Sequence, residues 1–244
     1  MKVVIVGNSG AGKTALYGSL VNAGYKVGII QADGNAAILD DAEVVKPANK
    51  ANLSVQLIDS ERPDSWGKMR SLLMNWPAWG PVEKWDDSYV LGVDSLSLAS
   101  RAALSFILKE TNNDIIKFAG ANSLSRDELG SIYGGVKQVF FNFVSACVSP
   151  SLKCHFVGTC HFRDIIANNT LKERRLAFEG SALSMEVPKR FGDVWELKQK
   201  LGSSGRVLLT RPDAIVGRKC SAPSLIKPEE EADLGKIFNR LKGV

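Results

Sequence analysis

The chain has 244 residues, of which 45% are hydrophobic and 23% are charged, and its formal net charge is +5. These values are ordinary for a globular protein and exclude an intrinsically disordered chain, while the small positive excess is compatible with a polyanionic partner. No apolar run reaches the roughly 18 residues of a membrane span, and the opening MKVVIVG is too short for a signal-peptide core, so we expect a cytoplasmic protein without a membrane segment.

The first predicted elements surround a glycine-rich loop. A β-branched run predicts a strand over residues 2–6, and apolar spacing predicts an amphipathic helix over 14–23. Between them the full GxxxxGK[ST] pattern is made by Gly7, Asn8, Ser9, Gly10, Ala11, Gly12, Lys13 and Thr14. A preceding strand and a following helix form the context that a phosphate-binding P-loop requires, so we predict an ATP site here.

Two P-loop side chains have separate predicted roles. Lys13 is expected to neutralise charge between the β- and γ-phosphates. The hydroxyl of Thr14 is expected to bind Mg²⁺, the metal that accompanies ATP.

The next elements carry candidates for the group that orients the attacking water. A strand is predicted over residues 26–32, another over 55–58 and a helix over 65–76. Asp33, at the carboxyl end of the first of these strands, is the predicted catalytic carboxylate, and Glu61 is the alternative. An ordinary turn at Asp33 and Gly34 also stays open.

Tryptophan is concentrated in one segment of the chain. Four of the five tryptophans fall within residues 66–85, around a loop that two prolines and a glycine punctuate. We favour core packing for these side chains over a platform for stacking bases.

A second magnesium ligand is predicted at the end of an apolar strand. Residues 89–95 have the composition of a strand buried on both faces, and Asp94 lies at its end. Asp94 is therefore the predicted partner of Thr14 in the metal shell. The alternative role for Asp94 is to cap a helix over residues 95–108.

The remaining pattern indicates the fold class. A helix over 133–148 and a strand over 154–159 continue the alternation, which predicts a mainly parallel, twisted sheet flanked by helices. Strands over 194–197 and 206–210, separated by Gly202-Ser203-Ser204-Gly205, predict an antiparallel extension before a last helix over 228–241. We expect one domain over 1–244, with a core over 1–182 and an extension over 183–244. Reduced structural thiols are expected at Cys147, Cys154, Cys160 and Cys220.

These motifs, in this order, resemble the RecA-like ATPase core, and most of all small phage-encoded RecA-like proteins proposed to anneal single-stranded DNA. The matching segments are the P-loop, Ile30-Gln31-Ala32-Asp33, Val93-Asp94-Ser95 and Gly158-Thr159-Cys160-His161. The resemblance implies a RecA-like P-loop NTPase fold, a Mg-dependent ATPase, and action on single-stranded DNA in annealing or recombination.

The resemblance also implies roles at the last of these strands and beyond it. His161 stands where the family often has a glutamine that senses the γ-phosphate. Residues 162–180 match the family's second DNA-binding loop, which implies DNA contacts by Phe162, Arg163, Lys172, Arg174 and Arg175, and base stacking by Phe178 as well. Three acidic residues leave this segment a net charge of only +1, so a solvated surface loop is the alternative.

A further segment of the resemblance concerns assembly. Residues 216–223 match the family segment that lends cations to a neighbouring subunit's ATP, which implies a homo-oligomer in which Lys219, with Arg218 beside it, acts in trans. An exposed basic turn is the alternative. Full-length recombinases carry a polymerisation helix before the P-loop strand with which this sequence opens, so a ring, a DNA-templated array and a monomer all stay open.

Other P-loop functions also fit the pattern. One is a small-molecule kinase, with residues 162–180 as its lid. Another is an ATPase or assembly factor that acts on protein, and a third is a slowly hydrolysing nucleotide-dependent regulator.

Overall fold

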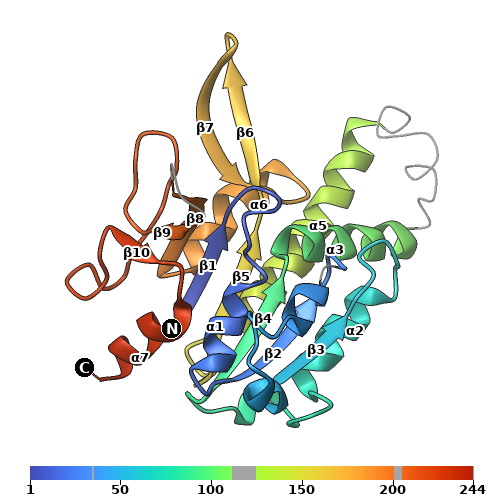
Figure 1. Ribbon diagram of the computed structural model, residues 1–244. Coiled ribbons are helices and arrows are strands. Elements are labelled where there is room, and N and C mark those ends of the chain that lie inside the picture. The colour runs from blue at the N-terminus through green and yellow to red at the C-terminus, as the bar shows by residue number, and fades with distance from the viewer. Residues whose placement is uncertain (35, 112–124, 201–204, 244) are drawn as a thin grey trace.

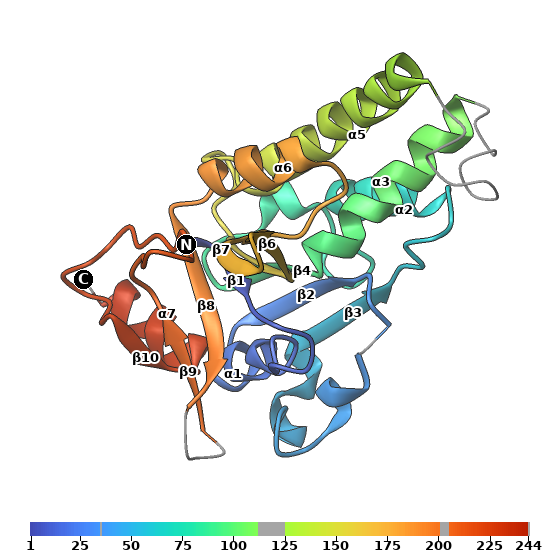
Figure 2. The same cartoon turned by 90° about the horizontal axis from the view of Figure 1, so that it is seen from above.

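A central sheet crosses the molecule, and helices cover both of its faces (Figures 1 and 2). The computed structural model describes residues 1–34, 36–111, 125–200 and 205–243. Within those ranges the sheet has eight strands in the order β10-β9-β8-β1-β5-β4-β2-β3. They are β1 (Lys2–Val6), β2 (Lys26–Gln31), β3 (Leu53–Leu57), β4 (Tyr89–Asp94), β5 (His155–Cys160), β8 (Asp193–Gln199), β9 (Arg206–Leu209) and β10 (Glu229–Glu231). From β8 to β3 all neighbours are parallel, which confirms the predicted fold class.

Two helical layers enclose this sheet. The layer over one face contains α2 (Ser65–Met74), α3 (Leu96–Glu110), α5 (Arg126–Cys147) and α6 (Ser181–Glu186), and the other contains α1 (Leu16–Asn22) and α7 (Leu234–Lys242) (Figure 2). Short 3₁₀ helices span Ala36–Asp40, Pro47–Asn52, Val82–Lys84 and Val187–Arg190. None of the helices in the described parts of the chain has the length and apolar character needed to cross a membrane.

Strand β1 shows why the sheet lies in the middle. Val4 and Val6 pack into the core under α2, α3 and α5, whereas Val3 and Ile5 pack into the core under α1 and α7. Side chains alternate between the faces of a strand, so an all-apolar strand is stable only where both faces are covered. Each fully buried aliphatic side chain contributes about 1.5–3 kcal/mol, so such strands strongly favour the three-layer arrangement.

The tryptophan-rich segment belongs to the core, as predicted. Trp76 and Trp85 are buried, and their ring centroids lie 5.6 Å apart in an edge-to-face contact. A methyl group on Gly28 of β2 would lie 2.8 Å from Trp85 and 2.9 Å from Trp76, so these rings pack directly on the strand. Trp66 is also buried and packs against Phe143 at 5.3 Å.

The carboxyl-terminal part differs from the prediction in its details. Strand β8 pairs in parallel with β1 and continues the main sheet, so only β9 and β10 form the antiparallel extension. The predicted boundary at 182/183 falls inside α6, and the helix predicted over 228–241 begins only at Leu234 because Glu229–Glu231 pairs with β9 as a strand. Residues 202–204 of the predicted glycine-serine connection lie outside the described ranges.

The segment expected to be a DNA-binding loop is mostly a β-hairpin. Strands β6 (Phe162–Ala167) and β7 (Thr170–Leu176) pair antiparallel and stand away from the sheet (Figure 1). Their turn consists of Asn168 and Asn169, with φ angles of 52° and 56°, which is the geometry of a tight two-residue hairpin turn. Charged residues on both strands interrupt the alternation of apolar and polar residues by which a strand is predicted.

Candidate functional site

Three adjacent strands end at the site. In the parallel register Val6 of β1 lies beside Cys160 of β5, and Val93 of β4 lies beside Gly158 of β5. The P-loop, Asp94 and His161 therefore lie close together at the same edge of the sheet. Ligands of open α/β sheets bind at the carboxyl ends of the strands, so this edge is the candidate site.

The P-loop has the backbone of an anion cradle. Gly10 and Gly12 have φ angles of 75° and 92°, which side chains other than glycine rarely adopt. The Ala11 N–H donates to the carbonyl of Asn8 at 3.2 Å and closes the loop. The amide N–H groups of Gly12, Lys13 and Thr14 donate to no other group within the part of the chain that the structure describes, and such groups are available to an anion.

Lys13 lies across this loop. Its Nζ donates to the carbonyls of Gly7 and Asn8, both at 2.9 Å, and lies 3.5 Å from Nδ1 of His161. Burial lowers the pKa of Lys13, and the nearby charge of Asp94 opposes that shift. A phosphate would supply an anionic partner, which favours the charged form of a buried ammonium group.

Asp94 is fully buried at the end of β4 and bound by two hydroxyls. The Thr14 hydroxyl donates to its Oδ2 at 2.6 Å, and the Thr159 hydroxyl donates to its Oδ1. Burial, and then the charge of Asp33, raise the pKa of Asp94. The alternative role as a helix cap is wrong, because Ser95 is the residue that caps α3, accepting from the Leu98 N–H at 3.4 Å.

The residues around Asp94 fit a magnesium ion. Thr14 and Asp94 place a hydroxyl and a carboxylate in contact, and Mg²⁺ prefers oxygen ligands of this kind while it keeps several waters. Gln31 of β2 pairs with Asp94 in the sheet register, and its side-chain oxygen is buried without a hydrogen-bond partner among the described residues. Such an amide oxygen next to the carboxylate adds a polar acceptor that suits a hydrated cation.

The two candidate carboxylates for water activation are placed differently. Asp33 accepts a hydrogen bond from the Gln31 amide, and its charge acts on Lys13, Asp94 and His161. Glu61 is exposed and forms an ion pair with Arg101 of α3 at 3.4 Å. The structure therefore brings Asp33 to the P-loop and directs Glu61 to a surface contact, although the catalytic role of Asp33 stays a prediction.

His161 is held beside Lys13 by its backbone. Its N–H donates to the Ser97 hydroxyl at 3.0 Å, and its carbonyl accepts from the Ala177 N–H at 2.8 Å. Burial and the neighbouring charge of Lys13 both lower the pKa of His161, which favours the neutral ring. A neutral imidazole beside the P-loop lysine can donate one hydrogen bond to a phosphate oxygen, as a γ-phosphate sensor requires.

Two of the predicted DNA contacts are engaged within the hairpin. Arg174 forms an ion pair with Asp164 at 3.0 Å and lies over the ring of Phe162, 5.4 Å from its centroid. Arg175 forms an ion pair with Glu173 at 2.7 Å. These pairs reduce the positive charge that the hairpin offers to a polyanion.

The other predicted contacts are more available. Lys172 is exposed, and none of the acidic side chains in the described ranges forms an ion pair with it. Arg163 is also exposed and donates to the carbonyl of Phe178 at 3.1 Å. The expectation that Phe178 stacks on bases is wrong, because its ring is only 2% exposed and packs against Phe140 at 5.5 Å.

The two cations predicted to act in trans both form hydrogen bonds within their own chain. Arg218 is buried and donates to the carboxylates of Glu196 and Asp213. Lys219 donates to the Phe191 carbonyl at 2.6 Å. Both cations therefore have partners within their own chain, and the trans role stays a prediction.

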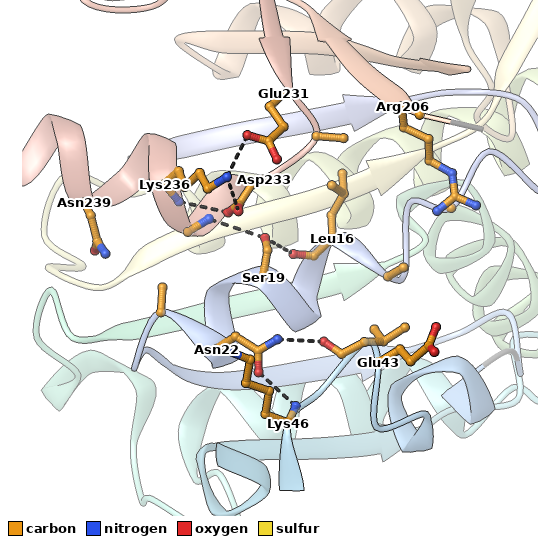
Figure 3. Close-up of a pocket in the computed structure, with 17 residues that line it drawn as sticks. Leu16, Ser19, Asn22, Glu43, Lys46, Arg206, Glu231, Asp233, Lys236 and Asn239 are labelled. Carbon is orange, nitrogen blue, oxygen red and sulfur yellow. Dashed lines mark hydrogen bonds and ion pairs between the residues drawn. The ribbon is translucent and has the colours of Figure 1, made fainter. Parts of the chain in front are cut away.

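A groove of about 710 Å³ runs from the P-loop along α1, between α7 and the segment around Val44. Gly12 and Ala15 line its P-loop end, together with Arg206 of β9, whose guanidinium points towards the loop that leads into α1 (Figure 3). The groove gives a ligand bound at the P-loop room to extend.

Sequence reasoning missed four residues of this site. Thr159 and Gln31 lie within the strand ends that were noted, and their polarity in apolar strands was the available signal. Ser97 supports His161 from α3, and Arg206 reaches the P-loop from β9. The local pattern of the sequence holds no signal for either contact.

No family model matches the chain, and neither does any curated protein. The ATPase EscN from the type III secretion system of enteropathogenic E. coli, solved with its central stalk EscO, aligns at 13% identity with a TM-score of 0.51 over 82% of this chain and 42% of EscN. A prototypical type III secretion ATPase of pathogenic bacteria aligns at 15% identity with a TM-score of 0.49, over 82% of this chain and 52% of that ATPase. The RadB recombinase aligns at 14% identity with a TM-score of 0.45, over 88% of this chain and 84% of RadB. The chain thus spans about half the length of the secretion ATPases. With the sheet order and the P-loop, the likeness to EscN shows a RecA-like P-loop NTPase fold.

Proposed function

We propose that this protein is a Mg-dependent ATPase. The observation that supports it best is the meeting of Lys13, the Thr14–Asp94 pair and His161 at one edge of the sheet. Phosphoryl transfer needs positioning and charge neutralisation more than covalent chemistry, and these residue types supply both.

Each side chain has one task in this proposal. Thr14 and Asp94 hold Mg²⁺, which neutralises charge on the β- and γ-phosphates when it is bound. Lys13 binds the phosphate oxygens, and Asp33 orients the attacking water. His161 donates a hydrogen bond to the γ-phosphate and thereby distinguishes ATP from ADP.

The β6–β7 hairpin is the proposed output of the site. The hairpin begins with the residue after His161. The N–H of Ala177, the residue that follows the second strand, donates to the carbonyl of His161 at 2.8 Å. A displacement of His161 on γ-phosphate binding would therefore be transmitted to both ends of the hairpin. This is a physical route by which a ligand on the hairpin controls hydrolysis.

We propose single-stranded DNA as that ligand, in annealing or recombination. Lys172 and Arg163 are the exposed cations of the hairpin, and Phe162 lies at its base. Arg174 and Arg175 would contribute by exchanging their carboxylate partners for phosphates. Such binding would weaken with salt, since counterions are released from the DNA.

A second candidate is an ATPase that acts on protein. The ion pairs of Arg174 and Arg175 reduce the positive charge that the hairpin offers to DNA, and Ile166, near its tip, is 66% exposed. An exposed aliphatic side chain at the end of a projecting hairpin suits an apolar protein surface.

Phosphate release from Mg·ATP, measured with and without single-stranded DNA, separates the two candidates. We expect DNA to raise the rate of the wild type, and the double variant Arg163→Ala/Lys172→Ala to lower the ratio of the two rates. The matched variant Ile166→Asn, on the same hairpin, should keep the wild-type ratio. Hydrolysis that is indifferent to DNA in every variant would contradict the DNA proposal and favour a protein partner.

A further inference from the structure

The guanidinium group of Arg206 lies against the P-loop. A methyl group built on Gly12 would be 2.5 Å from Cζ and 2.5 Å from Nη1 of Arg206, far inside van der Waals contact. Gly12 is the residue immediately before Lys13, so this arginine lies beside the phosphate-binding loop.

The sheet determines where the Arg206 side chain begins. Arg206 is the first residue of β9 and pairs with Gln199 of β8, and β8 lies in parallel beside β1. On the other side, the Ala232 N–H donates to the carbonyl of Arg206 at 3.4 Å. Its Cα is thus anchored two strands away from the strand that carries the P-loop.

Among the residues that the structure describes, no carboxylate balances the charge of Arg206. The side chain is exposed, and none of the Asp or Glu side chains in the described ranges forms an ion pair with it. Two carboxylates of the adjoining groove, Glu231 and Asp233, form ion pairs with Lys236 instead, at 2.7 and 3.7 Å (Figure 3). A guanidinium without an acidic partner beside a phosphate-binding loop favours an anionic ligand.

The strand order shows on which side of the P-loop strand Arg206 lies. Asp94 ends β4 and His161 follows β5, on one side of β1, whereas Arg206 comes from β9, on the opposite side. If the γ-phosphate lies towards Asp94 and His161, the other end of the phosphate chain lies towards Arg206. That end is also the one from which the 710 Å³ groove extends.

We propose, on the basis of the ATPase function above, that Arg206 binds the phosphate chain of the nucleotide in its own subunit, on the nucleoside side of Lys13. The guanidinium offers two parallel N–H groups to phosphate oxygens. Because the contact does not involve the γ-phosphate, it stabilises bound ADP as much as bound ATP. Arg206 is then a nucleotide-affinity residue and does not sense the state of hydrolysis.

Equilibrium binding of Mg·ADP, of a non-hydrolysed Mg·ATP analogue and of pyrophosphate tests this assignment. We expect Arg206→Ala to weaken the binding of all three by about tenfold or more, the usual effect of one hydrogen bond to a charged group. Arg206→Lys should retain part of the affinity, because it keeps the charge and loses the paired donors. Arg70→Ala, which removes an exposed arginine from α2, is the matched control and should bind like the wild type.

Three results would overturn the assignment. One is unchanged or tighter binding in Arg206→Ala; another is a loss confined to the ATP analogue, which would place Arg206 at the γ-phosphate. The third is weaker nucleotide binding with unchanged pyrophosphate binding, which would place it on the nucleoside. If the wild type itself binds no nucleotide, the ATPase proposal fails; if Lys13→Ala weakens binding and Arg206→Ala does not, only the role of Arg206 fails.

Discussion

The hydroxyl of Thr14 donates a hydrogen bond of 2.6 Å to the carboxylate of Asp94, although 80 positions separate the two residues in the sequence. Thr14 ends the P-loop and Asp94 ends β4, and strand β5 lies between β1 and β4 in the sheet. This contact brings together a hydroxyl and a carboxylate, the kinds of oxygen ligand that would hold Mg²⁺ at the P-loop.

Replacement of Asp94 with asparagine tests the metal site. Asn has nearly the same shape and can still accept from Thr14, but it lacks the charge that binds a hard cation. We expect phosphate release at limiting Mg²⁺ to fall on the order of 10²-fold. Excess Mg²⁺ should restore part of the rate. A magnesium titration of the variant beside Asp40→Asn, an exposed control, makes the measurement, and identical titration curves would contradict the assignment.

Two substitutions of His161 test the γ-phosphate contact. His161→Gln keeps a hydrogen-bond donor of similar reach, so we expect it to retain most of the ATPase activity. His161→Ala removes the donor, so it should lower kcat more than it changes the affinity for ADP. Single-turnover hydrolysis and ADP binding measure the two effects separately. Equal activity of the two variants would show that the ring makes no contact that matters for turnover.

His155 predicts how stability depends on pH. Burial, and then the adjacent positive charge of the Met1 ammonium group, lower the pKa of His155 to about 3, and its Nε2 is buried without a partner among the described residues. The unfolded ring titrates near 6.5, so below that pH the unfolded chain takes up a proton that the folded chain excludes. Stability is therefore fully present above pH 6.5 and falls as the pH is lowered towards about 3.

The size of this effect follows from linkage. Between pH 6.5 and 5, the free energy of unfolding should fall by up to about 2 kcal/mol through His155. His155→Phe, which suits the edge contacts with Tyr25 and Phe238, should flatten the dependence, and His161→Gln should retain more of it. Denaturant unfolding at several pH values provides the comparison. The same slope in His155→Phe and the wild type would exclude His155 as the cause.

Trp85 tests the structural role of the tryptophan cluster. Its ring is 2% exposed and packs on Gly28, so Trp85→Ala should reduce the free energy of unfolding by about 3–5 kcal/mol. Chemical denaturation measures the loss. The variant protein that remains folded should keep its response to DNA, because no face of the ring is available for stacking. A selective loss of DNA response with unchanged stability would favour a base-stacking role.

The parts of the site that the sequence predicted are those that follow directly from local patterns. The P-loop is a continuous motif, and parallel strands bring their carboxyl ends to one edge, so Asp94 and His161 could be placed near Lys13 from their positions at strand ends. The helix starting at Arg126 had a readable signal as well, since Ser125 and Glu128 form a capping box.

Other features depend on contacts that no local pattern encodes. Arg218 looks like an exposed basic residue until β8 brings Glu196 to it, and the two residues are 22 positions apart. The pairing of Arg174 with Asp164 exists only because β6 and β7 form a hairpin. Arg206 reaches Gly12 through a strand order that becomes clear only once β8 is known to lie beside β1.

Magnesium-dependent phosphate release by the wild type and by Lys13→Ala tests the central claim most directly. We predict that the wild type hydrolyses ATP and that Lys13→Ala is at least about 100-fold slower, because the variant loses the ammonium group that lies at the carbonyls of Gly7 and Asn8. A thermal melt should show that the variant is folded. Equal phosphate release by the two proteins, or none by the folded wild type with or without DNA, would contradict the assignment of this edge of the sheet as an ATPase site.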